Sequence, residues 1–216
     1  MKKRFLQTFL AIIFLGSFSG VSWAQSVTHN YVNTTRSSAI AHIFVSQSVE
    51  GEYGEFETSG GRSAFGLTAS EPSVSKWRGY NLSQTLGIEV MKFIQFNVSH
   101  SMMSMRSSAS SLERIGGSRF SGGAKLVFLA PLANLEAGGG VIGTRYDYQR
   151  YMSTSDFYGS GFYYSLGFNY FMSERVSFFG QAKSIDEHSV RTGGDADAKT
   201  INSRTTNIGT GFTLWL

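Results

Sequence analysis

The last thirteen residues of the chain, Arg204–Leu216, read RTTNIGTGFTLWL and alternate between two kinds of side chain. One set of alternate positions is mostly large and apolar: Ile208, Thr210, Phe212, Leu214 and Leu216. The positions between them are small or polar as far as Thr213. Because successive residues of a β-strand point to opposite faces, this stretch predicts a strand with one apolar and one polar face.

The same alternation recurs in six segments further upstream. They are Tyr80–Val90, Ile94–Ser99, Phe120–Leu129, Leu135–Tyr148, Tyr158–Phe171 and Val176–Lys183. Each has roughly the length of a tilted membrane strand, about ten residues. No run of eighteen apolar residues follows Ala24, so we exclude a helical membrane protein. In lipid, the remaining way to satisfy every backbone N–H and C=O group is a closed barrel, with its apolar face toward the lipid.

A bacterial single-chain barrel has an even number of strands, so an eighth strand must precede these seven. Two candidates compete for it, Ser38–Val49 and Arg62–Ala69. The first is longer and fits a membrane span better, and it would make Gly51–Lys76 a large external loop. The sequence therefore predicts an all-β protein, an eight-stranded antiparallel up-and-down transmembrane β-barrel.

The connections between the predicted strands alternate between short and long. The short ones are Met91–Phe93, Ala130–Asn134 and Met172–Glu174, and the long, more polar ones are Arg106–Ser118, Gln149–Phe157 and Glu187–Ser203. Outer-membrane barrels have short periplasmic turns and longer external loops. This pattern places the C-terminus in the periplasm and the polar loops outside.

The N-terminus has the three-part layout of a secretory signal peptide: a basic start, Met1–Arg4, an apolar run, Phe5–Phe18, and small residues after it. We predict cleavage after Ala24. The expected parts are a signal peptide, 1–24, an N-terminal periplasmic segment, 25–37, and the barrel, 38–216. The chain contains no cysteine, which excludes a lipid-attachment cysteine, disulfides and thiolate metal sites.

The net charge argues against nucleic acid as a partner. The formal charge of the whole chain is +4, but Lys2, Lys3 and Arg4 leave with the signal peptide and no acid leaves with them, so the mature chain carries only +1. A nearly neutral domain lacks the basic surface that nucleic-acid binding requires.

In its signal peptide, its strand and loop rhythm from Ser38 to Leu216 and its terminal strand, the chain resembles the small outer-membrane barrels of the OmpA, OmpX and opacity-protein type. The resemblance implies export through the general secretory pathway, insertion by the barrel-assembly machinery, and a monomer in contact with outer-membrane lipids including lipopolysaccharide. In that group the last residue is typically aromatic. Here it is Leu216, with Phe212 and Trp215 nearby.

Four charged residues occupy predicted lumen-facing positions on four different strands: Glu89, Lys125, Glu136 and Lys183. Charges buried together must pair or carry a large desolvation cost. Eight strands leave a lumen about wide enough for side chains to fill, so we favour a static ion-pair plug. The alternative is a narrow pore for ions or small solutes, gated by these pairs.

Two histidine–serine neighbours, His100–Ser101 and His188–Ser189, raise the further alternative of an outer-leaflet lipid-modifying enzyme, a lipid A or phospholipid hydrolase. A catalytic serine needs its base within hydrogen-bond reach, but adjacent strand residues point to opposite faces. We therefore predict no catalytic residue, and no metal or cofactor.

Several aromatic residues lie where the predicted strands meet the membrane surfaces, and we expect their rings at the headgroup level. They are Trp77, Tyr80, Tyr148, Tyr151 and Trp215. The favoured function is a non-enzymatic structural or adhesin-like role, with external loops that could contact a surface ligand.

Overall fold

The computed structural model describes residues 40–59, 73–109, 113–129, 133–150, 153–194 and 199–216. The predicted signal peptide, 1–24, the segment 25–37, the strand candidate Arg62–Ala69 and Tyr151 lie outside the described residues. Among the described residues, no helix is long and apolar enough to cross a membrane.

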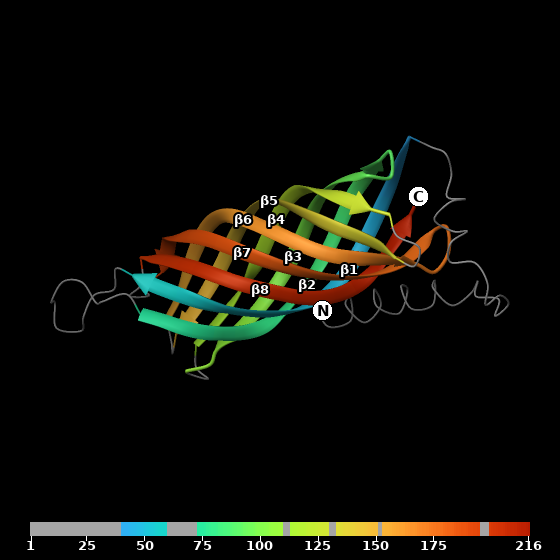
Figure 1. The fold of residues 1–216 in the computed structure, drawn as a ribbon. Coiled ribbons are helices and arrows are strands. Elements are labelled where there is room, and N and C mark those ends of the chain that lie inside the picture. The colour runs from blue at the N-terminus through green and yellow to red at the C-terminus, as the bar shows by residue number, and fades with distance from the viewer. Residues whose placement is uncertain (1–39, 60–72, 110–112, 130–132, 151–152, 195–198) are drawn as a thin grey trace, which may run out of the picture.

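Eight antiparallel strands form one closed barrel, which confirms the predicted fold class (Figure 1). They are β1 (Ala41–Ser59), β2 (Ser73–Val90), β3 (Ile94–Ser107), β4 (Glu113–Phe128), β5 (Asn134–Arg150), β6 (Ser153–Phe171), β7 (Val176–Gly194) and β8 (Thr200–Trp215). Each strand pairs with its neighbours in sequence, and β1 closes the barrel against β8.

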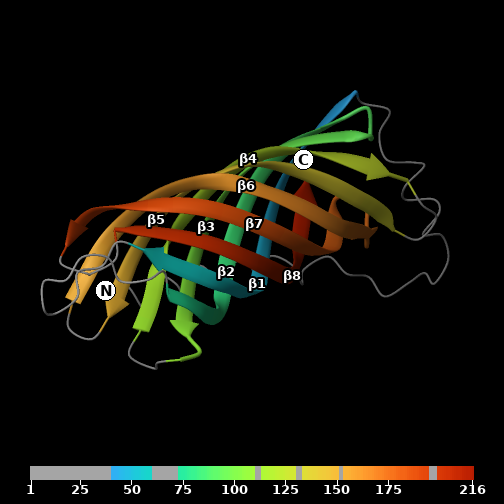
Figure 2. The ribbon, with the colours of Figure 1, turned by 60° about the vertical axis from the view of Figure 1, so that its left-hand side comes forward.

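The strands are strongly inclined to the barrel axis, as Figure 2 shows. Following the paired residues once around the barrel from Gln47 on β1 leads back to the same strand at Glu57, ten residues further along. A stagger of this kind accompanies a tilt of roughly 35–45° in an eight-stranded barrel. Such a barrel has an interior that side chains can fill.

The barrel has two ends. At the terminal end β1 begins and β8 finishes, because Phe44 pairs with Trp215. The turn after β2 lies at this end too, since the Met91 N–H donates to the Ile40 carbonyl at 2.8 Å. We call the opposite end the distal end.

The predicted assignment of the two faces is confirmed. On β8, Ile208 is 61% exposed and Phe212 57%, whereas Asn207 and Thr213, on the other set of alternate positions, are buried. The same outward apolar pattern runs around the barrel, with Tyr164 73% exposed on β6. An apolar surface of this extent requires an apolar surrounding, which for a barrel is lipid.

The first strand is the candidate that began at Ser38, but it is much longer than predicted. β1 continues to Ser59 and stays paired with β2, from Gly51 opposite Tyr80 to Thr58 opposite Ser73. Both ends of the predicted loop Gly51–Lys76 are therefore strand.

The three other predicted long loops are also mostly strand. β3 and β4 extend to Ser107 and Glu113, β5 and β6 are separated only by residues 151–152, and β7 runs to Gly194. The distal end therefore carries more paired strand than the sequence predicts. Strand pairing continues beyond the apolar band because the backbone N–H and C=O groups of each strand still form hydrogen bonds with those of its neighbour.

Candidate functional site

The inward face of β1 passes through every layer of the barrel interior. From the terminal end it presents Phe44, then Glu50 and Glu52, and then Phe56, all of them buried. Phe44 and Phe56 belong to separate apolar clusters, and the two carboxylates lie between them. The interior is thus a column with two charged layers enclosed by apolar ones.

Phe44, Phe171 and Trp215 form the apolar cluster of the terminal end. The ring centroid of Trp215 lies 5.0 Å from that of Phe44 and 5.6 Å from that of Phe171. Its indole N–H donates to the hydroxyl of Ser177 at 2.9 Å, and the residue is 3% exposed. The prediction of Trp215 as a membrane-interface residue is wrong, because its side chain faces the lumen and finds its hydrogen-bond partner there.

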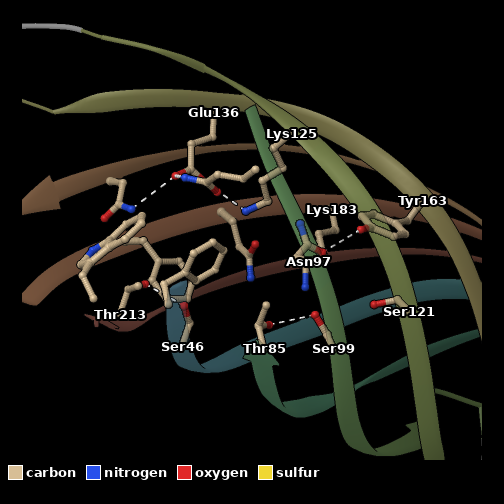
Figure 3. A pocket seen from close by; sticks show the side chains of 16 residues that line it. Ser46, Thr85, Asn97, Ser99, Ser121, Lys125, Glu136, Tyr163, Lys183 and Thr213 are labelled. Carbon is tan, nitrogen blue, oxygen red and sulfur yellow. Dashed lines mark hydrogen bonds and ion pairs between the residues drawn. The ribbon is translucent and has the colours of Figure 1, made fainter. Parts of the chain in front are cut away.

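The first charged layer contains the predicted lumen residues. Lys125 Nζ lies 3.0 Å from Glu136 Oε2, so the structure brings these two together (Figure 3). The side-chain amide of Gln95 donates to Glu136 at 3.2 Å and to Glu89 at 3.1 Å, linking the two acids. Asn169 donates a further hydrogen bond to Glu136 at 3.3 Å.

Lys183 pairs with an acid that the sequence analysis did not single out. Its Nζ lies 2.9 Å from Glu50 Oε1. Glu50 is 1% exposed and also accepts hydrogen bonds from Gln181 at 2.7 Å and Asn207 at 3.2 Å. Each oxygen of this carboxylate therefore has donors around it, as a buried charge requires.

The second charged layer was missed altogether, and Arg119 is its centre. The guanidinium binds Glu52 at 2.5 Å through Nη1 and Glu187 at 2.9 Å through Nη2. Nη2 also donates to the hydroxyl of Tyr146 at 3.0 Å, and that hydroxyl donates in turn to Glu187. Arg119 is 1% exposed, so one cation connects four strands, β1, β4, β5 and β7, inside the barrel.

A simple signal could have found this layer. Arg119 lies on the same face of β4 as Gly123 and Lys125, because an even number of residues separates them. Glu52 lies on the same face of β1 as Ser48 for the same reason. Both residues therefore belong to the lumen-facing sets of alternate positions. The predicted strands end short of Arg119, and the predicted loops contain Glu52 and Glu187. Extending the alternation by a few residues would have placed all three inside.

The distal end is closed by the largest apolar cluster of the interior. Its members are Phe56, Trp77, Met103, Met105, Ile115, Tyr146, Tyr148, Phe157 and Ile201. Trp77 and Tyr148 are 3% and 5% exposed, so their predicted position at the membrane interface is wrong. Tyr80, from the same set of predicted residues, does point outward and is 56% exposed.

A cavity of about 40 Å³ remains inside the column, lined by Lys125, Lys183, Glu136 and Tyr163 among others (Figure 3). This volume holds only a few water molecules. Aromatic side chains border it, including Phe44 and Trp215 from the terminal cluster. The space is a pocket within a packed interior.

The two histidine–serine neighbours do not form catalytic pairs. Ser101 and Ser189 are buried toward the lumen. His100 lies on the outer face with its ring centroid 4.5 Å from that of Phe120, and His188 Nδ1 lies 2.6 Å from Asn202 Oδ1, also on the outside. The barrel wall separates each histidine from its neighbouring serine.

No protein-family model and no curated protein matches the chain. Among solved structures, Neisserial surface protein A is 13% identical with a TM-score of 0.52, covering 79% of this chain and 96% of that one. OprG from Pseudomonas aeruginosa is 12% identical with a TM-score of 0.55, covering 80% and 96%. The outer membrane protease OmpT from Escherichia coli is 10% identical with a TM-score of 0.40, covering 81% of this chain and 97% of that one.

These likenesses concern the fold alone, and at that level they confirm the predicted resemblance to small outer-membrane barrels. An eight-stranded barrel of this kind with an apolar outer band implies the bacterial outer membrane.

Proposed function

We propose that this protein is a non-enzymatic outer-membrane barrel with a structural or surface-interaction role, carried by its distal end. The observation that supports it best is the network around Arg119, a buried cation held by Glu52, Glu187 and Tyr146 between apolar clusters. Such a column cross-links the barrel from within and leaves the outside and the distal loops as the surfaces available to partners.

The proposal includes the route to the membrane. The signal peptide of residues 1–24 directs export through the general secretory pathway. The outward residues Ile208, Thr210, Phe212 and Leu214 of β8, together with Leu216 directly after it, present the assembly signal to the barrel-assembly machinery. The terminal end then faces the periplasm and the distal end faces outside, with the protein a monomer.

The test is deletion of the gene in the bacterium that carries it, followed by complementation. We expect the deletion strain to become more sensitive to detergent or to lose surface attachment, and the wild-type gene to restore the defect. Arg119→Ala should restore it less well because the barrel is weakened. Hydrolysis of lipid A or phospholipid by the purified barrel would contradict a non-enzymatic role.

A second candidate, a narrow pore, draws support from the cavity between Lys125 and Lys183. If the pairs of these lysines with Glu136 and Glu50 form a gate, then Lys183→Ala should open it. We expect planar-bilayer recordings to show no conductance for the wild type or for this variant. Steady channel currents from Lys183→Ala would favour the pore.

A further inference from the structure

Three arginines stand side by side on the outer face of the barrel near its distal end. Arg78 on β2 is directly opposite Arg106 on β3, and Arg106 is directly opposite Arg114 on β4. All three side chains are exposed. We call them the arginine row.

Like charges directly opposite each other on neighbouring strands are destabilising. The row has no compensating acid: within the part of the chain that the structure describes, none of its three side chains forms an ion pair or hydrogen bond. The nearest outward acids, Glu55 on β1 and Asp147 on β5, flank the row without pairing with it. The repulsion is therefore left for an external anion to relieve.

Another arginine on the outer face is paired with an acid of the barrel itself. Arg204 on β8 is directly opposite Asp186 on β7, and its Nη2 lies 3.2 Å from the Asp186 carboxylate. Here the barrel supplies its own anion. The arginine row differs from this pair in having three cations on adjacent strands and no such partner.

The position of the row relative to the lipid identifies the anion. The large apolar residues that face outward nearest to the row are Leu82, Met102 and Phe120, and the arginines lie four to six residues closer to the distal end on the same strands. At roughly 3.3 Å per residue on a strand tilted by roughly 40°, this places them about 10–15 Å beyond the last apolar residues, outside the hydrocarbon core and on the polar side of the leaflet. The exposed ring of Tyr80 lies in between, where aromatic residues mark the interface.

We propose that the arginine row is a binding site for the phosphate groups of lipopolysaccharide in the outer leaflet. Guanidinium groups pair with phosphate through two parallel hydrogen bonds, and several of them together match a headgroup that carries more than one phosphate. The row lies on the lipid-facing side of the wall, so a lipid headgroup reaches it directly. The inference rests on the proposed orientation in the outer membrane and adds to it a named lipid site.

The experiment uses the full barrel in lipid nanodiscs and measures binding of phosphorylated lipopolysaccharide, the same lipid after enzymatic dephosphorylation, inorganic phosphate, and heparin. The variants are Arg78→Ala/Arg106→Ala/Arg114→Ala, the same three positions changed to Lys, and the control Arg204→Ala. We expect the triple Ala variant to bind phosphorylated lipopolysaccharide at least about tenfold more weakly than the wild type, with the Lys variant in between and the control unchanged.

Thermal unfolding gives a second readout. Phosphorylated lipopolysaccharide should raise the Tm of the wild type and of Arg204→Ala, but should raise that of the triple Ala variant much less. Without lipopolysaccharide the triple Ala variant should be at least as stable as the wild type, because repulsion within the row is gone.

Three results would overturn the site: equal binding by the wild type and the triple Ala variant, equal binding of the dephosphorylated lipid, or tighter binding of inorganic phosphate or heparin than of lipopolysaccharide. Heat-modifiable migration on gels monitors barrel folding separately. A wild-type chain that fails to form a barrel in lipid contradicts the proposed function, whereas a folded barrel that ignores the phosphates contradicts only the arginine row.

Discussion

At the scale of single residues, Arg119 contributes most to the interior. Two acids, Glu52 and Glu187, share its guanidinium, and all three groups are almost completely buried. Removing one partner from a buried ion pair leaves an uncompensated charge, which costs far more than the net stabilisation by the pair itself.

Arg119→Ala should therefore lower the free energy of unfolding by about 3–5 kcal/mol. Urea unfolding in lipid vesicles measures it. The exposed pair Asp186–Arg204 provides the control, because Arg204→Ala should cost no more than about 1 kcal/mol. Adding Glu52→Gln and Glu187→Gln to Arg119→Ala should recover much of the loss. A loss at Arg119 no larger than at Arg204 would mean that the network is not buried as described.

A second prediction concerns Asp147, which faces outward beyond the apolar band. Partial burial, a hydrogen bond with Asp156 on the next strand and the charge of that residue raise the pKa of the Asp147 carboxyl. Folding therefore favours the protonated form, and the charged form lowers stability at neutral pH. Asp147→Asn should stabilise the barrel at pH 7 and lose this advantage as the pH falls through the raised pKa. An advantage that persists at low pH would mean that the charged form of Asp147 is not the cause.

At the scale of the strands, the sequence predicted the membrane-spanning parts, but most predicted strands end before the distal end, and only the prediction for β5 comes close to its full length. Along a strand, the same alternate positions keep facing outward, but toward the distal end the outward residues change from apolar to polar and the inward residues from polar to apolar. On β5, Val141 is exposed to lipid, but further along Tyr146 and Tyr148 point inward and Asp147 points outward. Past the lipid the barrel is polar outside and apolar inside, like a soluble one. A search for outward apolar residues therefore ended too early and missed Arg119.

The turn between β2 and β3 supplies a prediction at this scale. Met91 and Lys92 have φ angles of 53° and 62°, and the Phe93 N–H donates to the Val90 carbonyl at 3.2 Å. This is the backbone of a type I′ hairpin turn, for which Asn-Gly is the preferred sequence. Met91→Asn/Lys92→Gly should raise the free energy of unfolding by about 1 kcal/mol, because non-glycine residues are strained at these angles.

The matched control for this turn is Glu174→Gly, in the connection between β6 and β7. There, no described non-glycine residue has a positive φ, so glycine relieves no strain and mainly adds freedom to the unfolded chain. The control should leave stability unchanged or lower it. Equal gains from both changes would exclude backbone strain as the reason.

At the scale of the whole molecule, the central claim is that the barrel is filled. The closed sheet and the lumen-facing positions of Glu89, Lys125, Glu136 and Lys183 followed from alternation in the sequence. The partners of those charges could not be predicted, because contacts across the barrel depend on the register of non-adjacent strands. A single sequence does not reveal that register. Glu50 opposite Lys183 is the clearest case.

The most direct test is the exchange of arginine side-chain protons with water, measured by NMR on the barrel in lipid nanodiscs. In a filled lumen the guanidinium protons of Arg119 are hydrogen-bonded and shielded, so they should exchange slowly, while those of the exposed Arg204 exchange fast. Exchange at Arg119 as fast as at Arg204 would mean that water passes freely through the barrel, and would contradict the account.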